Sequence, residues 1–449
     1  MPHTLRPYQE TGRGFLRTRR FAILGDFMGL GKTPQYLRAA QDVGGRILIL
    51  APAATLPGLA REIMTWAPGL GTPTVLDHAG KRSAPDVGVS ILAWTSAAKR
   101  MPDLIVGPMF DVVICDESHR LKNPTAKSTR AVLGQWVKVA GQWVRTHCLA
   151  AHSRRLWAAT GTPLPNRPID LQPLLHMGGG VRWASRAAFG DAYCRQFNRF
   201  TPTGFDYLGA NNLDHLNSAL TREGCLLRRL PEDVPGELPA FSVSIVPLAG
   251  VRDPVSMLGM SAALIREACD AGESVPFEET SAYRAEVGLA KAPKASAWIK
   301  EWLEDHPGDA LVVFAWHKAV GELIAGELGD DALLAHGGHS PKKRQSQVDA
   351  FAAGAGRVFI GSIAACGTGL NGLHLRTTMC VFAESPWTHY EMVQAIGRVR
   401  RFGSVNDHTH AYILVGEDSI EDYVLQTVAK KLDISDAVLG EGEHAFPFG

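Results

Sequence analysis

The sequence has few of the features that mark secreted or membrane proteins. It holds only seven cysteines in 449 residues, and no two of them form a Cys-x-x-Cys pair. An odd, scattered set of this kind predicts reduced thiols and argues against a disulfide framework or a zinc site. The N-terminal residues, Met1 to Arg6, lack the apolar core of a signal peptide, and no apolar run is long enough to span a bilayer. We therefore expect a soluble protein of the cytoplasm.

An excess of charge of one sign is also missing, since 46 Lys and Arg residues stand against 45 Asp and Glu residues. The balance gives no overall basic signal, so any surface that binds nucleic acid must be a local patch. An apolar content of 45% and a charged content of 20% are those of a globular protein. The chain length suits two domains of about 200 residues each.

The segment Gly25-Asp26-Phe27-Met28-Gly29-Leu30-Gly31-Lys32-Thr33 has the pattern of a nucleotide phosphate loop. It follows a short apolar run and leads into a stretch, residues 35–41, that is compatible with a helix. Gly29 and Gly31 let the backbone bend so that its N–H groups point at phosphate oxygens. Lys32 would reach the terminal phosphates, and the Thr33 hydroxyl would ligate Mg²⁺. The strict pattern has glycine where Asp26 stands, and a chance glycine-rich turn is the alternative.

A pair of carboxylates, Asp116 and Glu117, follows an apolar run at residues 110–115. The run reads as a buried parallel strand, and open α/β sheets bind ligands at the carboxyl ends of their strands. Asp116 would hold Mg²⁺, and Glu117 would orient and deprotonate the attacking water. A solvated acidic turn is the alternative, which the upstream phosphate loop disfavours. The two motifs together predict ATP hydrolysis.

Short apolar runs alternate with helix-length segments through both halves of the chain, which predicts an α/β fold with parallel sheets and helices on both faces. The predicted strands are residues 21–24, 46–50, 89–93, 111–115, 156–159 and 225–228, then 241–246, 310–314, 333–335, 357–360, 379–383 and 411–415. Three prolines and a glycine in residues 230–239 mark a junction, because neither a helix nor a central strand tolerates them. We expect an ATP-binding lobe at 1–230, a linker at 231–240 and a second lobe at 241–449. Segments at about 177–223 and 252–286 fit the sheet pattern poorly and are predicted to be mostly helical insertions.

The tetrapeptide Gly-Gln-Trp-Val occurs at residues 134–137 and again at 141–144. A repeat of seven residues would place both tryptophans on one face of a helix. Such a face is most often a packing stripe, and a contact with DNA or a protein partner is the alternative.

The remaining motifs follow a fixed order along the chain. They are Leu-Arg-Pro-Tyr-Gln (5–9), Asp-Phe-Met-Gly-Leu-Gly-Lys-Thr (26–33), Asp-Glu-Ser-His-Arg-Leu-Lys-Asn (116–123), Ala-Thr-Gly-Thr-Pro-Leu-Pro-Asn (159–166), Leu-Arg-Arg (227–229), Val-Phe-Ala-Trp-His-Lys (313–318), Gly-Thr-Gly-Leu-Asn (367–371) and Gln-Ala-Ile-Gly-Arg-Val-Arg-Arg-Phe-Gly (394–403). From Leu5 to about Ser404 this series resembles the Swi/Snf-type ATPases of helicase superfamily two. The motifs at 116–119 and 313–318 are most similar to those of the annealing-helicase, or fork-remodelling, branch. The resemblance implies two tandem RecA-like lobes, the first of the DEAH type.

The resemblance also assigns roles in hydrolysis. It implies that Gln9 reads the adenine, and that Lys32, Thr33, Asp116 and Glu117 form the hydrolytic site with ATP and Mg²⁺. Arg398 and Arg401 would be arginine fingers from the second lobe, and Gln394 would help to position water or the γ-phosphate. Arginines three apart on a helix share roughly one face, and their fixed charge suits a developing phosphate charge. A basic helix that touches DNA or solvent is the alternative, and Arg400 lies off that face.

The family analogy also implies residues that contact DNA. Thr160 and Thr162 would link the ATP site to DNA, although hydroxyl caps in a turn after a strand are an alternative. Contacts to the DNA backbone would lie around Thr55, Thr95, Lys122, Asn123, His317, Lys318, Gly337 and Lys342. Solvated surface residues are the alternative for each of these. Trp387 matches an aromatic position of the family, with a packing role as the alternative.

The sequence departs from the family pattern in three respects. Phe27 replaces a usual glutamate, and Ser404 stands where the last motif often ends in glutamine. The chain also starts near the adenine motif and stops soon after the arginine motif, so we expect a compact form without accessory domains. Such a form would be monomeric, and its size would suit a viral or mobile-element genome.

Three functions are compatible with these motifs. The leading one is a DNA-dependent ATPase that moves along duplex or branched DNA, or remodels it, without necessarily separating the strands. The second is a DNA or RNA helicase that separates strands with the same core. The third is a module that binds nucleic acid or a partner without turnover, which the intact Lys32, Asp116, Glu117, Arg398 and Arg401 disfavour.

Overall fold

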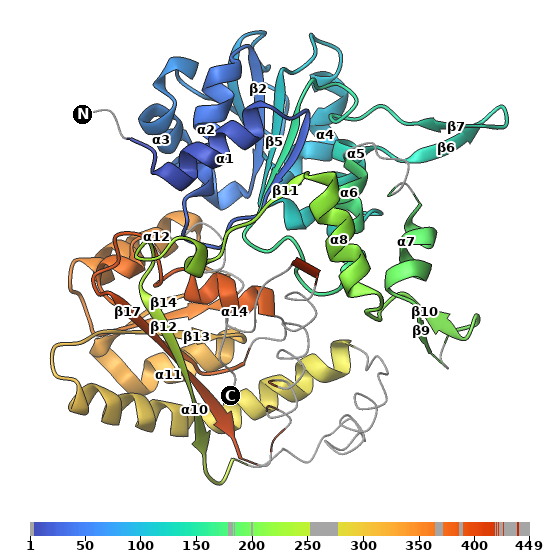
Figure 1. Cartoon of the computed structure of the whole chain (residues 1–449). Helices are drawn as coiled ribbons and strands as arrows, with labels where there is room; N and C mark the ends of the chain where they lie inside the picture. Colours follow the sequence, from blue (N-terminus) through green and yellow to red (C-terminus); the bar gives the residue numbers. More distant parts are fainter. Residues whose placement is uncertain are drawn as a thin grey trace. The chain divides into compact units, whose positions relative to one another are not determined.

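The chain forms two compact units (Figure 1). The computed structural model describes residues 4–177, 183, 185–198, 201–251, 277–363, 371–385, 389–417, 419, 421, 425, 438 and 439. The first unit comprises Met1–Gln196, Phe205–Pro235 and Ile434–Glu441, and the second comprises Phe197–Gly204, Gly236–Asp433 and Gly442–Gly449. Val438 is fully buried in the core of the first unit, where its carbonyl accepts a hydrogen bond from Asn217 Nδ2 at 2.9 Å. A segment near the end of the chain therefore completes the core of the first unit.

The first unit is built on a parallel sheet with the order β11-β1-β8-β5-β2-β4-β3. Its strands are β1 (Phe21–Leu24), β2 (Arg46–Ala51), β3 (Thr74–Leu76), β4 (Gly88–Ala93), β5 (Val112–Asp116), β8 (Leu156–Ala159) and β11 (Leu226–Leu227). All pairings in this sheet are parallel, so the carboxyl ends of the strands lie along one edge.

Helices cover both faces of this sheet. They are α1 (Pro7–Arg17), α2 (Lys32–Val43), α3 (Leu56–Trp66), α4 (Trp94–Leu104), α5 (Lys127–Leu133), α6 (Gln172–Met177), α7 (Arg186–Tyr193) and α8 (Leu213–Glu223). Successive residues of β2 alternate between two cores: Ile47 joins the core formed with α1, α2 and α3, and Leu48 joins the core formed with α4 to α8. This alternation follows from the two-residue period of a strand, and it explains why the strand is apolar throughout.

The second unit repeats the same architecture. Its parallel sheet has the order β12-β17-β16-β13-β15-β14. The elements are β12 (Ala240–Leu248), α10 (Phe277–Asp305), β13 (Leu311–Ala315), α11 (Lys318–Leu328), β14 (Ala332–Ala335), α12 (Pro341–Ala352), β15 (Val358–Ser362), β16 (Met379–Phe382), α14 (His389–Ile396) and β17 (His408–Gly416). Val358 and Ile360 of β15 pack in the core with α10 and α11, whereas the ring of Phe359 lies 5.6 Å from that of Phe351 on α12. Helices therefore cover both faces here as well.

Short 3₁₀ helices connect several of these elements. They are η1 (Ala53–Thr55), η2 (Pro68–Leu70), η3 (Ser118–Lys122), η4 (Pro168–Asp170), η6 (Pro231–Asp233), η7 (Gly329–Asp331) and η8 (Leu373–Leu375). Within the described part of the chain, each helix is either too short or too polar to cross a membrane.

These two sheets confirm the predicted fold class of two tandem RecA-like lobes. Each predicted strand coincides with an observed one to within a few residues. Among the described residues, the strands that were not predicted are β3, the hairpin of β6 (Trp136–Val139) and β7 (Gln142–Arg145), and the short strands β9 (Gln196–Phe197) and β10 (Phe205–Asp206). The predicted insertion at 177–223 contains α7 and α8 together with β9 and β10. Most of the insertion predicted at 252–286 lies outside the described residues, as do residues 367–370 and Trp387.

The prediction of a helix through the Gly-Gln-Trp-Val repeat is wrong. The two copies form an antiparallel hairpin of β6 (Trp136–Val139) and β7 (Gln142–Arg145), which extends outward from the first unit (Figure 1). Ala140 and Gly141 connect the strands with φ values of 48° and 85°, the positive values that a two-residue type I′ turn needs. A seven-residue repeat fits two short strands and a tight turn as well as it fits a helix, and the valines favour strands.

Candidate nucleotide site and arginine motif

The predicted phosphate loop connects β1 to α2 in the first unit. Gly29 and Gly31 have φ values of 90° and 69°, a region of the backbone map that favours glycine. A Cβ atom at Gly31 would lie 2.6 Å from Gln9 Nε2. Glycine at this position therefore permits both the bend of the loop and the close approach of Gln9.

Lys32, the first residue of α2, turns its side chain into the loop. Its Nζ atom donates hydrogen bonds to the carbonyl oxygens of Asp26 at 2.8 Å and Phe27 at 3.3 Å. Burial lowers the pKa of Lys32, and the charges of Glu117, Asp26 and Asp116 oppose that shift. The next residue, Thr33, is the second residue of α2 and is half-buried. The ammonium and hydroxyl that the sequence predicts for phosphate and Mg²⁺ are thus both at this loop.

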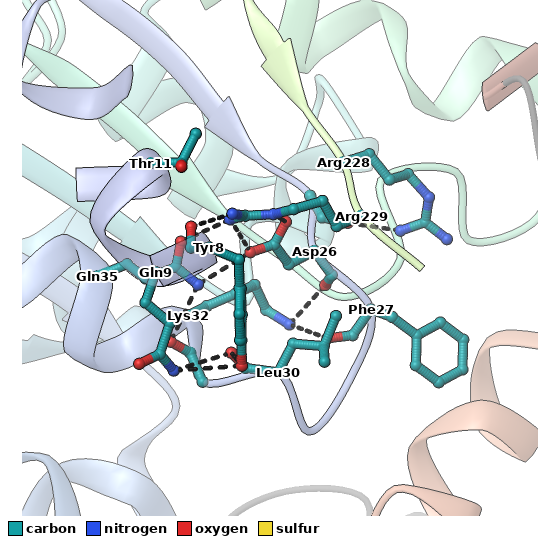
Figure 2. A network of polar contacts seen from close by, with 12 residues as sticks. Tyr8, Gln9, Thr11, Asp26, Phe27, Leu30, Lys32, Gln35, Arg228 and Arg229 are labelled. Atoms are coloured by element: carbon teal, nitrogen blue, oxygen red, sulfur yellow. Dashed lines mark hydrogen bonds and ion pairs between the residues drawn. The ribbon is translucent and has the colours of Figure 1, made fainter. Parts of the chain in front are cut away.

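Gln9 and Tyr8 of α1 lie against the same loop (Figure 2). Gln9 Nε2 and the Tyr8 hydroxyl both donate to the carbonyl oxygen of Leu30, at 3.2 and 3.0 Å. Gln9 Oε1 accepts a hydrogen bond from the backbone N–H of Arg6 at 3.1 Å. The structure therefore brings the predicted adenine-reading residue into direct contact with the phosphate loop.

Asp116 is the last residue of β5, and Glu117 follows it. Burial raises the pKa of Asp116 well above the usual range of a carboxyl, the charge of Glu117 raises it further, and Lys32 opposes both effects. Glu117 has φ 51° and ψ 49°, a left-handed conformation that residues other than glycine adopt rarely. Strained backbone of this kind gathers at functional sites, where the surrounding structure holds it. Because the negative charges of Asp116 and Glu117 repel each other, a cation bound between them would stabilise the site.

His119 connects Glu117 to the Thr160 segment that follows β8. Its Nδ1 atom lies 3.3 Å from Glu117 Oε2 and 3.2 Å from the Thr160 hydroxyl. The Thr160 hydroxyl also accepts a hydrogen bond from the backbone N–H of Thr162 at 3.1 Å, and both threonines are buried. Between them, a Cβ atom at Gly161 would lie 3.3 Å from Lys32 Nζ. His119 lies within the motif at residues 116–123, but the motif alone predicts no role for it.

These residues fit a nucleotide with Mg²⁺. A glycine loop at a helix start, a lysine and a threonine hydroxyl suit phosphate groups. The half-buried Asp116 beside Glu117 supplies the hard oxygen ligands that Mg²⁺ prefers. Lys32 gives up only backbone carbonyl partners when it turns to a phosphate.

The arginine motif of the second unit begins in the last turn of α14 and continues beyond it. Gln394 is 4% exposed, and its Nε2 atom is buried without a hydrogen-bond partner among the residues that the structure describes. Arg398 is 6% exposed. Arg401 donates from Nη1 to Asn371 Oδ1 at 2.5 Å and from Nε to the carbonyl of Gly397 at 2.6 Å. Because α14 ends at Ile396, the arginines lie in the turns after the helix, and the expectation that they share a helical face is wrong.

Two neighbours in this motif have structural roles. Arg400 donates from Nε to the carbonyl of Pro239 at 2.8 Å and lies over the ring of Phe241. The Ser404 hydroxyl accepts from the backbone N–H of Arg401 at 2.9 Å and is close to the Arg401 carbonyl at 2.7 Å. Ser404, a departure from the family pattern, thus stabilises the turn that carries Arg401.

The residues predicted to contact DNA follow strand ends in each unit. In the first unit Thr55, Thr95, Lys122 and Asn123 follow β2, β4 and β5, and therefore lie at the carboxyl edge of the sheet. In the second unit His317 and Lys318 follow β13, Gly337 follows β14, and Lys342 is in the first turn of α12. Thr95, Lys122, Asn123, Gly337 and Lys342 are exposed.

Several of these residues already have protein partners. Asn123 Oδ1 accepts from the backbone N–H and the hydroxyl of Thr125 at 2.9 and 2.7 Å. His317 Nδ1 is 2.6 Å from Glu384 Oε1, and Lys318 is 3.3 Å from Glu322. The role of each in binding DNA stays a prediction.

The first parallel-sheet unit thus combines a phosphate loop with an acidic pair, and the second parallel-sheet unit carries an arginine motif. A family model described as the SNF2-related domain matches residues 8–249, and one described as the helicase conserved C-terminal domain matches residues 293–403. The chain therefore belongs to the SNF2-related family, which confirms the resemblance seen in its motifs.

Curated relatives match almost the whole chain. A protein named SWI/SNF-related matrix-associated actin-dependent regulator of chromatin subfamily A-like protein 1 from Xenopus laevis is 27% identical over 440 residues, which is 96% of this chain and 43% of the relative. Its counterpart from Bos taurus is 28% identical, over 98% of this chain and 45% of the relative. The DNA annealing helicase and endonuclease ZRANB3 of Homo sapiens is 26% identical, over 97% and 40%. The chain spans less than half the length of these relatives.

A solved structure, the Sulfolobus solfataricus SWI2/SNF2 ATPase core in complex with dsDNA, aligns with 99% of this chain and 94% of its own, at 17% identity and a TM-score of 0.46.

Proposed function

We propose that this protein is an ATP-dependent motor that moves along or remodels double-stranded DNA. The observation that carries the proposal is the set of groups around the phosphate loop: Lys32 inside the loop, Asp116 with its raised pKa, and Glu117 in contact with His119. Membership of the SNF2-related family and the similarity to relatives named as annealing helicases and chromatin regulators support DNA as the substrate.

In this proposal the residues of the first unit bind and hydrolyse ATP. Lys32 leaves the carbonyl oxygens of Asp26 and Phe27 and binds the terminal phosphates, while Gln9 reads the adenine. Thr33 and Asp116 would hold Mg²⁺, which neutralises phosphate charge when bound. Glu117 takes the proton from the attacking water, and His119 fixes the direction of the Glu117 carboxylate.

Residues of the second unit complete the proposed reaction. Arg398 and Arg401 would stabilise the negative charge that grows on the transferring phosphoryl group. Arg401 would give up its hydrogen bonds to Asn371 and Gly397 and would contact the phosphoryl oxygens instead. The buried amide of Gln394 would position the water. We propose the lobe boundaries at 1–230 and 241–449 with a linker at 231–240.

The protein would move along DNA because its two units would bind the DNA backbone in alternation. The residues at strand ends, such as Thr95 and Lys122 in the first unit and Lys318 and Lys342 in the second, would contact the DNA backbone. ATP binding and hydrolysis would change which unit holds the backbone, as in other enzymes driven by lobe closure. A cytoplasmic location and a monomeric state are part of the same proposal.

Two strand-release assays run in parallel test translocation. The first measures ATP-dependent displacement of a third strand from a DNA triplex, and the second measures unwinding of a forked duplex. We expect displacement of the third strand without release of the duplex strands. Release of the duplex strands at a comparable rate would favour the strand-separating helicase, and ATP hydrolysis with neither release would remove the motor function.

A further inference from the structure

The Leu227-Arg228-Arg229 motif has no role in the function proposed so far. Both arginine side chains nevertheless reach the segment that begins the phosphate loop, about two hundred residues earlier in the sequence (Figure 2). Arg228 Nη1 donates to the carbonyl of Gly25 at 2.5 Å and to that of Gly161 at 3.2 Å. It therefore joins the start of the phosphate loop to the Thr160–Thr162 turn.

Arg229 forms the more extensive set of contacts. Its Nε and Nη2 atoms donate to the two carboxylate oxygens of Asp26 at 2.9 and 2.5 Å. Nη2 also donates to Gln35 Oε1 at 2.8 Å, and Nη1 donates to the carbonyl of Tyr8. The guanidinium lies 5.1 Å from the centre of the Tyr8 ring.

Asp26 depends on this arginine. It is fully buried, and it stands where the strict phosphate-loop pattern has glycine. A buried carboxylate is costly unless it is paired and hydrogen-bonded, and a bidentate arginine is the strongest partner available to it. Gln35 Nε2 supplies a further hydrogen bond to Asp26 Oδ2 at 2.9 Å and one to the carbonyl of Gly31 at 3.2 Å.

The hydrogen bonds among Arg229, Asp26 and Gln35 connect both ends of the phosphate loop. Asp26 opens the loop and Gly31 precedes Lys32, while Tyr8 precedes the adenine-reading Gln9. Two backbone hydrogen bonds also fix the start of the loop. Gly25 N donates to the Leu227 carbonyl at 2.7 Å, and Phe27 N donates to the Arg229 carbonyl at 2.8 Å. When Lys32 leaves the Asp26 carbonyl for a phosphate, the Asp26 side chain stays fixed by Arg229.

We infer that Arg229 is a positioning residue for the nucleotide. Through Asp26 and Gln35 it sets the distance between the adenine-reading helix α1 and the phosphate loop, and Arg228 holds the loop against the Thr160–Thr162 turn. The inference rests on the proposed ATPase function. It gives the Leu-Arg-Arg motif a role in nucleotide affinity and makes Asp26 the group through which that role is exerted.

Gly12 on α1 offers a test that removes no charge. A Cβ atom at Gly12 would lie 1.8 Å from Gln35 Oε1 and 2.9 Å from Arg229 Nη2, so an alanine there must displace this pair. In the same helix, a Cβ atom at Gly14 would meet nothing within 4 Å. Because alanine is favoured over glycine inside helices, G14A is the matched control for the helix itself.

The experiment measures equilibrium binding of a fluorescent ATP analogue to the full chain and its variants R229K, R229Q, G12A, G14A and R100K. Arg100 is a buried arginine of the same unit that donates to the carbonyls of Asp77 and Arg82, away from the loop. We expect R229Q to weaken binding by about 10- to 100-fold, the scale seen when supporting contacts of metal ligands are removed. R229K keeps the charge but not the bidentate geometry, and should recover only part of that loss.

G12A should weaken binding in the same direction, while G14A and R100K should bind like the parent. At saturating ATP the kcat of R229K should stay within about threefold of the parent, because the residue acts on binding. Parent-like affinity in both R229K and G12A would overturn the inference, and if R229Q fails to fold these two variants still decide it. Binding without DNA-stimulated hydrolysis in the parent would overturn the proposed function alone, and a parent that binds no ATP would overturn both.

Discussion

At the scale of single residues, the two adjacent carboxylates at the carboxyl end of β5 differ in their surroundings. The pKa of Asp116, the last residue of the strand, is raised by desolvation and by the charge of Glu117, whereas the side chain of Glu117 is 22% exposed and contacts His119. Groups whose environments separate their protonation behaviour commonly divide the tasks of a site. Asp116 suits cation binding, and Glu117 suits proton transfer.

Replacing Glu117 with Gln should preserve ATP binding and stop multiple turnover. The amide keeps the size and the contact with His119 but cannot accept the proton of the water, so we expect kcat to fall by about 10²- to 10⁴-fold. Steady-state hydrolysis and nucleotide binding check this, with Glu10→Gln on the surface of α1 as the control. Turnover within a few-fold of the parent would remove Glu117 from the role of base.

Replacing Arg401 with Ala should slow hydrolysis much more than it weakens nucleotide binding, because the charge that it meets grows in the transition state. Arginine fingers in GTPases contribute about three to five powers of ten in rate, or roughly 4–7 kcal/mol. Arg357→Ala is the control, since Arg357 donates to backbone carbonyls of the second unit. If ATP affinity collapses while kcat holds, the finger assignment is wrong, and the same comparison applies to Arg398.

The sequence predicted the residues whose motifs are local. Lys32, Thr33, Asp116 and Glu117 each belong to a short pattern next to a strand, so a single sequence is enough to predict a role for them. The network of Asp26 with Arg229 could not be predicted in the same way, because its partners come together only through the pairing of β1 with β11. The one hint in the sequence was Asp26 itself, a carboxylate at a position where the strict phosphate-loop pattern has glycine.

At the scale of elements, the parallel strands were predictable because burial on both faces makes them continuously apolar. The β6–β7 hairpin was not, because its length and spacing also fit a helix. Its decisive signal was the pair Ala140-Gly141 between valine-rich segments, since a two-residue connection with positive φ values selects a hairpin.

Replacing Ala140 with Asn should stabilise the hairpin. Ala140 has φ 48°, a left-handed conformation that costs an ordinary residue about 1 kcal/mol and costs asparagine less. Hydrogen exchange of the amides in residues 136–145 should slow in A140N and accelerate in A140V, where the branched side chain is least tolerant. Equal exchange in the two variants would contradict the assigned turn.

At the scale of the whole molecule, the free energy of unfolding should depend on the protonation of the half-buried His374. Burial, with the charge of Arg401, lowers the pKa of His374 to about 4 from an ordinary value of 6.5. Between these two pH values the unfolded chain binds a proton that the folded chain does not. His374 therefore reduces the free energy of unfolding as pH falls from about 6.5 to about 4.

Asp116 acts in the opposite direction, because its raised pKa lets the folded chain bind a proton earlier. The parent curve alone is therefore not diagnostic, and the difference between the parent and H374Q isolates the histidine. Thermal unfolding midpoints from pH 7.5 to pH 4.5 should show the parent losing stability relative to H374Q on acidification. A constant difference across this range would contradict the assignment.

The order of the two lobes was also predictable from the sequence, but one long-range feature was not. Val438, near the end of the chain, is buried in the core of the first unit. A short apolar segment after the last strand carries no signal of which core it joins, since only the folded packing decides that.

The central claim is that hydrolysis at this site serves movement on duplex DNA, and the most direct test is the rate of ATP hydrolysis with duplex DNA, forked DNA, single-stranded DNA, RNA or no nucleic acid. We expect duplex and forked DNA to raise the rate well above single strands and RNA. Because the chain is near-neutral overall, binding to DNA must come from local contacts between basic residues and phosphates. We expect it to fall log-linearly with salt at a slope near −0.9 per phosphate contacted. A rate that DNA leaves unchanged, or that single strands or RNA raise more than duplex DNA, would contradict the account.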